Sequence, residues 1–99
     1  MNLKALSKLK IGSKKGAALL KALAHPERLL ILCQLVDGEK NVGELLTHSG
    51  LSQSAFSQHL GVLRGKKIVE TRKEMQLVYY RLVDKPTLQV LQLLHKIYC

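Results

Sequence analysis

The sequence predicts a mainly α-helical fold with one small β-hairpin. Apolar residues recur at helical spacing between positions 16 and 63, and a stretch rich in Val, Tyr and Thr follows at residues 68–83. A further helical stripe runs onward from Pro86. These three observations carry the fold class, and a length of 99 residues suits a single domain with one modest core.

The first fifteen residues are strongly basic. They contain five lysines, no acidic residue and leucines at positions 3, 6 and 9, before an expected break at Gly12 and Ser13. This composition fits a loose basic arm or a frayed helix, and the lysines suit a solvated tail as well as a DNA-contacting arm. We therefore predict an arm at residues 1–15 and a folded domain at residues 16–99.

Two helices are predicted to follow. The spacing of Ala and Leu indicates a helix at residues 16–24, and Pro26 suits the first position of a second helix at residues 26–36. This second helix is apolar almost all round, which predicts a central, buried position. Asp37 and Gly38 end it.

The next segment predicts a helix-turn-helix arrangement. Asn41 can cap a short helix that reaches His48, and the following Ser-Gly pair can turn the chain. Ser52 can then cap another helix. Two helices joined by a tight, glycine-containing turn are typical of DNA-binding domains.

The helix after Ser52 has two unlike faces. Phe56, Leu60 and Leu63 share one face at about 100° per residue. The opposite face carries amides, hydroxyls, a glycine and one cation: Gln53, Ser54, Ser57, Gly61 and Arg64. Such side chains can approach base edges and phosphates in the major groove, whereas an ordinary surface helix more often carries Glu and Lys pairs. We predict a DNA-recognition helix, with a polar helix that has no partner as the alternative.

Residues 68–73 and 76–83 predict the two strands of a hairpin. The Glu74-Met75 pair makes a poor tight turn because it lacks the Gly or Asn that relieves a positive φ, so we expect a longer or a strained loop. Arg72, Lys73 and Gln76 lie near the tip, where they suit a wing on a groove or a phosphate backbone. A solvated basic hairpin is the alternative.

Pro86 can start a last helix that reaches the end of the sequence. Its apolar stripe comprises Leu88, Leu91, Leu94 and Tyr98, with Val90 and Ile97 broadening it. A stripe this broad predicts a helix that pairs with a second copy of the chain.

Charge and composition narrow the partners. Sixteen Lys and Arg against seven Asp and Glu give a formal net charge of +9, which favours a polyanion such as nucleic acid. Four aromatic residues of the Phe, Tyr and Trp types are too few for a base-stacking platform, so duplex DNA is favoured over single strands. No long apolar run or signal sequence is evident, and we expect a cytoplasmic protein with no membrane contact. No spacing of nucleophile, base and orienting group suggests an enzyme, and no cofactor is expected.

Three segments, ALAHPERLLIL, LSQSAFSQHL and VYYRL, occur in an order that resembles the ArsR family of winged-helix bacterial repressors over residues 15–99. The resemblance implies a winged helix-turn-helix homodimer, paired through the first and last helices, that binds double-stranded operator DNA. Ser54, Ser57, Gln58 and His59 match the groove-facing positions of the family. Gln58 can bind adenine through two hydrogen bonds. His59 lies at the edge of the packed face, so a buried histidine and a phosphate contact both remain open.

The same resemblance bears on the signal. The cysteine-containing metal site of the family is missing at residues 41–45, and Asp84 is followed two positions later by Pro86 in place of a ligand. The contexts LLILCQL and LLHKIYC of Cys33 and Cys99 resemble the persulfide- and redox-sensing branch of the family. That branch implies a disulfide or polysulfide bridge that alters DNA binding, with reactive sulfur species or oxidants as inducers.

Several alternatives stay open. Cys33 could be a small core residue and Cys99 an incidental thiol. His95 lies one helical turn before Cys99, so these two residues and Cys33 could instead hold a soft metal in a metal- or metalloid-responsive repressor. A basic protein that binds any nucleic acid sequence is the alternative of another class. The leading prediction is a sequence-specific repressor or anti-repressor switched at Cys33 and Cys99.

Overall fold

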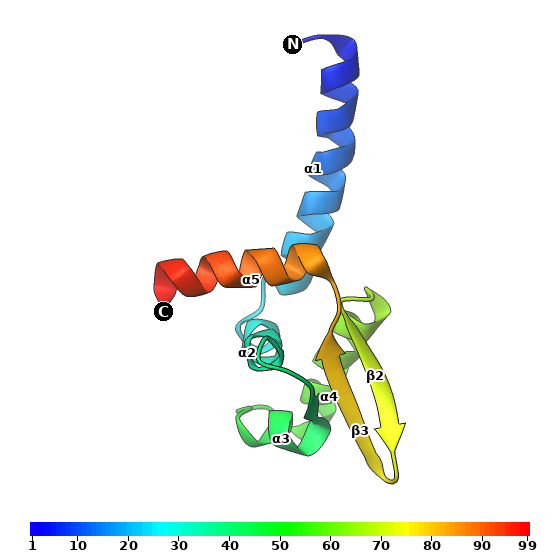
Figure 1. Cartoon of the computed structure of the whole chain (residues 1–99), viewed down its shortest axis with the longest axis vertical. Helices are drawn as coiled ribbons and strands as arrows, with labels where there is room; N and C mark the ends of the chain where they lie inside the picture. Colours follow the sequence, from blue (N-terminus) through cyan, green and yellow to red (C-terminus); the bar gives the residue numbers. More distant parts are fainter.

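The computed structural model describes residues 1–99. Its elements, in chain order, are α1 (Leu3–Leu23), α2 (Pro26–Leu35), β1 (Lys40–Asn41), α3 (Val42–Thr47), α4 (Gln53–Gly65), β2 (Val69–Glu74), β3 (Leu77–Leu82) and α5 (Lys85–Tyr98). Figure 1 shows α2, α3, α4 and the hairpin gathered on one side of α5, while α1 points away on the other side. The predicted winged helix-turn-helix fold class is confirmed.

One core joins α2, α4, α5 and the sheet. The predicted packing face of α4 is confirmed, because Phe56, Leu60 and Leu63 are at most 3% exposed. The other apolar residues of this core are Ala22, Leu23, Ile31, Leu32, Leu35, Leu45, Ile68, Val69, Tyr80 and Leu91. Burying one such side chain stabilises the fold by about 1.5–3 kcal/mol before the cost of ordering it. The core therefore fixes α4 with its polar face outward.

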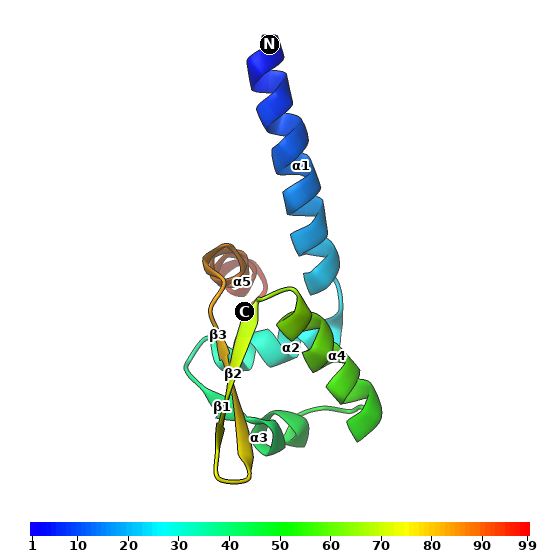
Figure 2. The ribbon, with the colours of Figure 1, turned by 90° about the vertical axis from the view of Figure 1, so that its right-hand side faces the viewer.

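Helix α1 corrects the expected break at Gly12 and Ser13. The helix is continuous because Asn2 caps it by accepting a hydrogen bond from the Ala5 N–H, and the Ser13 hydroxyl donates to the Leu9 carbonyl. A glycine costs a helix about 1 kcal/mol relative to alanine, and the surrounding Leu, Lys and Ala residues are strong helix formers. Residues 1–15 are therefore not a loose arm in this structure; they extend the helix away from the core (Figure 2).

The predicted all-round burial of the second helix is wrong. Ile31, Leu32 and Leu35 of α2 are buried, but Leu30 is 42% exposed and Cys33 is also exposed. The helix contacts α1, α4, α5 and β3, and these elements do not enclose it within one chain. The sequence of α2 shows that the helix is apolar on most sides, but it does not show what covers the side that the chain leaves exposed.

A third, two-residue strand accompanies the hairpin. Lys40 and Asn41 of β1 pair antiparallel with Tyr80 and Tyr79 of β3, which makes β3 the central strand. Two residues are too short to show alternation, so the sequence did not predict this strand. Asn41 then caps α3 through a reciprocal pair of hydrogen bonds with Glu44, as the capping prediction required.

The wing closes tightly. Strands β2 and β3 pair from Val69 with Leu82 to Glu74 with Leu77, which leaves Met75 and Gln76 as the turn. The sequence predicted either a longer or a strained loop. Met75 has a φ of 56°, so the loop is the strained one. The turn lies one residue later than the sequence indicated.

Helix α5 begins at Lys85, where Asp84 caps it by accepting hydrogen bonds from the N–H and hydroxyl of Thr87. Within the predicted apolar stripe, Leu91 is buried and Tyr98 is 80% exposed. Ile97 is also 59% exposed. No helix has both the length and the apolar character needed to cross a membrane.

Candidate nucleic-acid interface and thiol pair

The outer face of α4 is free of other parts of the chain. Ser52 starts the helix by accepting a hydrogen bond from the Ala55 N–H. A Cβ built on Gly61 would meet no atom within 4 Å, so a duplex could approach the helix closely there. The predicted base- and phosphate-contacting residues on this face are all exposed: Gln53, Ser54, Ser57, Gln58 and Arg64.

The turn between α3 and α4 is held from α2. The Ser49 hydroxyl donates to Glu27 over 3.2 Å, and the Leu51 N–H donates to the Ser49 hydroxyl oxygen over 3.1 Å. Sequence reasoning missed Glu27 because the contact spans 22 positions. Glu27 therefore helps to fix the entry to the recognition helix.

His59 faces α2 and is half-buried. Its Nδ1 accepts a hydrogen bond of 3.1 Å from Arg28 Nε, and Arg28 also donates to the Ala22 carbonyl. The ring lies 4.5 Å from that of His25, tilted by 57°. Burial lowers the pKa of His59, and the neighbouring His25 and Arg28 lower it further. This arrangement suits a structural histidine, and His25 belongs to the same contact.

The wing presents its polar residues unequally. Lys73 and Gln76 are exposed without a side-chain ion pair or hydrogen bond, as a DNA-contacting wing requires. Arg72 instead donates to Glu39 over 2.6 Å and to Glu74, and its guanidinium lies 4.4 Å from the centroid of the Tyr79 ring. A DNA contact by Arg72 would have to break these interactions.

These contacts change the titration of the paired groups. The hydrogen bond from Arg72 lowers the pKa of Glu39, and the two carboxylates raise the pKa of Arg72. Both groups therefore stay charged near neutral pH. The pairing ties the outer half of the wing to the loop between α2 and β1.

Cys33 and Cys99 are free thiols at the surface. Cys33 lines a cavity of about 230 Å³ together with residues of α5, including Leu91, Gln92 and His95. Partial desolvation by the residues around this cavity raises the pKa of the Cys33 thiol, and the Cys99 side chain raises it further. The Cys99 N–H donates a hydrogen bond of 2.8 Å to the carbonyl of His95, so the two cysteines lie near the same end of α5 although they are 66 positions apart in the sequence.

Of the three expected ligands of the alternative soft-metal site, two line the same cavity. Cys33 and His95 line one cavity. No group of three or more His, Cys, Asp or Glu side chains is placed to hold a metal ion. The alternative of Cys33 as a core residue is also contradicted, because its side chain is exposed.

Comparison with known proteins identifies the family. A family profile described as bacterial regulatory protein, arsR family, matches residues 25–71. The chain is 48% identical over 99 residues to the transcriptional activator HlyU of Vibrio cholerae, across 100% of this chain and 89% of that protein. The chain belongs to the ArsR family.

Further matches place this ArsR-family regulator in the branch that contains HlyU and BigR. It is 47% identical over 83 residues to the biofilm growth-associated repressor of Xylella fastidiosa, across 84% of this chain and 73% of that protein. The structure of reduced HlyU from Vibrio cholerae matches with a TM-score of 0.88 and 48% identity, covering 93% of this chain and 97% of that one. The repressor BigR from Xylella fastidiosa matches with a TM-score of 0.85 and 41% identity, covering 100% and 98%.

The sequence-based assignment to the ArsR family is therefore confirmed, and this ArsR-family protein is a transcriptional regulator. The relatives named above include an activator and a repressor. Membership alone therefore leaves the direction of regulation undetermined. The similarity to HlyU and BigR also agrees with the branch of the family that the sequence contexts of Cys33 and Cys99 resemble.

Proposed function

We propose that this ArsR-family regulator binds operator DNA as a homodimer and that a bridge between Cys33 and Cys99 controls its affinity. The single observation that carries the proposal is geometric: Cys33 of α2 lines a cavity with His95 of α5, and Cys99 follows one helical turn after His95, in a fold whose recognition helix is free. Ser54, Ser57 and Gln58 read bases, and Lys73 and Gln76 of the wing contact the backbone. Arg64, near the end of α4, contacts a phosphate.

The surface chemistry of α4 supports sequence-specific binding over indiscriminate binding. Hydroxyl and amide groups discriminate bases in the major groove, where one good bidentate pair is worth about 1–3 kcal/mol. Lysines and arginines give affinity that does not depend on sequence and falls with salt. Both kinds of group are exposed on α4 and the wing.

The order of thiol chemistry follows from the two environments. The raised pKa of Cys33 disfavours its thiolate, so Cys99 reacts first. The Cys99 thiolate attacks the outer sulfur of a small-molecule persulfide, RSSH, and forms a Cys99 persulfide as the thiolate RS⁻ leaves. The Cys33 thiolate then attacks the inner sulfur of that persulfide, which forms the disulfide as hydrosulfide, HS⁻, leaves. Overall, two thiols and one RSSH give one disulfide, one RSH and one molecule of hydrogen sulfide.

A bridge would join α2 to the end of α5, and these two helices affect DNA binding in different ways. Helix α2 contacts α4 directly, and α5 is the proposed pairing helix. Joining Cys33 to Cys99 would therefore restrict how α4 lies relative to the dimer and so alter the spacing of the two recognition helices.

The test compares DNA affinity in defined thiol states. The promoter of the protein's own gene and a scrambled duplex are titrated with the reduced wild type, the persulfide-treated wild type and the variants Cys33→Ser and Cys99→Ser. We expect treatment to change the operator affinity of the wild type by at least about fivefold, the lower end of typical coupling energies, and to leave both variants unchanged.

Mass spectrometry of the same samples checks the chemistry. The wild type should lose two hydrogens, with whole sulfur atoms gained in addition where the bridge is a polysulfide, while Cys33→Ser should accumulate a Cys99 persulfide. An unreactive Cys99 in Cys33→Ser would contradict the order of attack. An affinity change that persists in either variant would contradict the bridge, and equal binding to operator and scrambled DNA would contradict sequence-specific reading.

A further inference from the structure

Two neighbouring residues of α2 hold the helix-turn-helix at separate points. The Glu27 carboxylate accepts a hydrogen bond of 3.2 Å from the Ser49 hydroxyl, in the turn before α4. The Arg28 Nε donates a hydrogen bond of 3.1 Å to His59 Nδ1, in the middle of α4. Figure 2 shows α4 running beside α2, and the two helices are in contact. The recognition helix is therefore fixed both at its entry and along its length.

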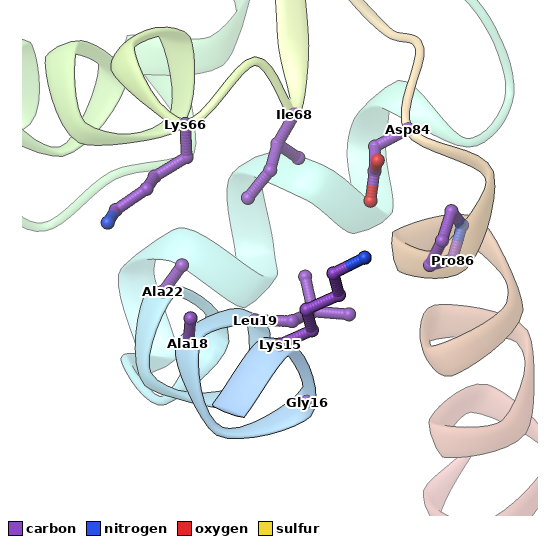
Figure 3. A pocket seen from close by; sticks show the side chains of 9 residues that line it. All are labelled: Lys15, Gly16, Ala18, Leu19, Ala22, Lys66, Ile68, Asp84 and Pro86. Carbon is purple, nitrogen blue, oxygen red and sulfur yellow. The ribbon is translucent and has the colours of Figure 1, made fainter. Parts of the chain in front are cut away.

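Arg28 is itself anchored in the core. Its Nη1 donates a hydrogen bond of 3.1 Å to the carbonyl of Ala22, near the end of α1. Ala22 is 3% exposed, and Figure 3 shows its side chain lining a hollow together with that of Ile68. A guanidinium carries its donors in a rigid planar fork, so the bond to Ala22 limits the positions that Nε can take. Arg28 thus connects a fixed part of the core to the recognition helix.

The contact requires a neutral His59 ring. An imidazole nitrogen that accepts a hydrogen bond carries no proton, so the single proton of the neutral ring is on Nε2. A second proton would go onto Nδ1, where the new N–H would face the N–H of Arg28 and place two positive charges side by side. The hydrogen bond could then not form.

The surroundings of His59 oppose that second proton. His25, in the segment before α2, has its ring 4.5 Å from that of His59, and Arg28 and Glu27 act on the ring from α2. Burial lowers the pKa of His59, and His25 and Arg28 lower it further, whereas the negative charge of Glu27 raises it. No charged group of β2, which also contacts α4, acts on the ring. The ring is thus neutral near pH 7.5 and gains its proton below about pH 6.5.

We propose that Arg28 is a positioning residue for the recognition helix, and that it acts only through the neutral ring of His59. While their hydrogen bond holds, α4 presents its outer face to the operator in one orientation relative to α2. Proton uptake breaks the bond and the orientation is no longer fixed, so specific binding weakens although neither residue touches DNA. The proposal rests on base reading by α4, as proposed above, and is independent of Cys33 and Cys99.

The first experiment measures specificity at two pH values. Fluorescence anisotropy with the promoter of the protein's own gene and with a scrambled duplex gives two affinities, at about pH 7.5 and about pH 5.8 and at one ionic strength. Their ratio removes the gain in attraction to any duplex that added positive charge gives. For the wild type we expect this ratio to fall at least about fivefold at the lower pH. Circular dichroism checks that the protein stays folded at both.

The outcomes separate this proposal from base reading as such. No preference for the operator at the higher pH would contradict sequence-specific reading. A clear preference there that is unchanged or larger at the lower pH would overturn the role of Arg28 and His59 alone. His59→Gln keeps an acceptor for Arg28 and cannot titrate, so its ratio should vary less with pH than that of the wild type. A full wild-type response in this variant would also overturn the proposal.

Substitutions at the two points of attachment give different expectations. Arg28→Leu removes the donor, so the ratio should already be low at the higher pH and should not fall further. Arg28→Lys keeps a cationic donor and should restore part of the response, and it replaces Arg28→Leu if that variant fails to fold. Ser49→Ala removes the other contact without changing the charges around His59, so it should change the ratio by the same factor at both pH values. Equal pH responses of the Arg28 variants and Ser49→Ala would contradict a link through His59.

NMR of isotope-labelled histidine identifies the group that titrates. The Nδ1 resonance of His59 should change with the same midpoint as the affinity ratio. His25→Gln removes a group that lowers the pKa of His59, so both midpoints should move to higher pH. His48→Gln alters an exposed histidine outside this contact and should leave both midpoints in place. An affinity midpoint that does not move in His25→Gln, or that follows another histidine, would overturn the proposal.

Discussion

Gln58 and His59 are neighbours in the sequence but have different roles. The Gln58 side chain is exposed on the outer face of α4. His59 turns toward α2, where Arg28 donates to its Nδ1 and His25 lies against its ring. One residue of helical rotation, about 100°, thus separates a proposed base-reading group from a group held within the protein.

Gln58 gives a direct test of base reading. Gln58→Ala should weaken operator binding by about 1–3 kcal/mol and scrambled-duplex binding much less, because the amide discriminates bases. Fluorescence anisotropy with both duplexes measures this. Gln89→Ala changes an exposed glutamine on α5 and should alter neither affinity. Equal losses on operator and scrambled DNA would refute base reading by Gln58.

His59 makes stability depend on pH. Its pKa is lowered in the folded protein by burial, His25 and Arg28, although Glu27 opposes this effect. The unfolded chain therefore binds a proton at this site more readily than the folded chain, beginning near the ordinary histidine pKa of about 6.5. The free energy of unfolding should fall as the pH decreases from about 7.5 through about 6.5 toward the lowered pKa.

Urea denaturation at about pH 7.5 and about pH 5.5, on either side of the ordinary histidine pKa, measures this dependence. His59→Gln keeps an acceptor for Arg28 but cannot titrate, so its loss of stability at the lower pH should be smaller than that of the wild type. The control His48→Gln changes an exposed histidine outside this contact and should lose as much as the wild type. An identical pH dependence for wild type and His59→Gln would show that His59 does not contribute.

At the scale of elements, local capping and turn chemistry decide most boundaries. Asn2, Asn41, Ser52 and Asp84 each accept a backbone hydrogen bond at the start of a helix. The wing is the exception, because its register forces Met75 to a φ of 56° that glycine adopts more readily. Strand pairing over six residue pairs therefore overrides the preference of one turn residue.

Replacing the strained residue should stabilise the protein. Met75→Gly should raise the free energy of unfolding by about 0.5 kcal/mol, because relief of the left-handed conformation exceeds the added chain entropy. Met75 is 90% exposed, so little packing is lost. Urea denaturation measures the change. Gln76→Gly, at the neighbouring turn position without a positive φ, should lower stability, and a gain there would contradict this account.

At the scale of the whole molecule, one chain leaves much apolar surface uncovered. The radius of gyration is 15.5 Å, against about 13 Å for a compact domain of 100 residues, because α1 extends from the core. Large apolar residues lie exposed on both terminal helices, with Leu20 of α1 at 58%, Leu93 of α5 at 56% and Ile97 of α5 at 59%. A second copy that covers α1 and α5 would bury this surface, as the proposed homodimer requires.

Ile97→Glu tests that pairing. A charge at a buried interface position is left without a partner, so the dimer dissociation constant should rise about a hundredfold or more. Sedimentation velocity over a concentration series measures it. Gln92→Glu introduces the same residue at an already polar, exposed position of α5 and should leave the constant near that of the wild type. A dimer unaffected by Ile97→Glu would exclude this face of α5 from the interface.

The sequence predicted those features that depend on neighbours within a few positions. Helix caps at Asn41 and Ser52, the packing face containing Phe56 and Leu60, and the two wing strands follow from local spacing and turn chemistry. Features that join distant positions were missed. The strand at Lys40 and the hold of Glu27 on the turn depend on contacts that no local pattern encodes.

By itself, the sequence determined that this is a winged helix-turn-helix regulator with a polar recognition face. It also contained two cysteines whose sequence contexts resemble those of the persulfide- and redox-sensing branch. Only the tertiary structure decided that α1 is one continuous helix, that Arg72 is paired to carboxylates, and that His59 faces α2. It also brought Cys33 beside His95, one helical turn before Cys99. The physical reason is that helical periodicity and capping act over one or two turns. Ion pairs, contacts between rings and the approach of one cysteine to another depend instead on how complete elements pack.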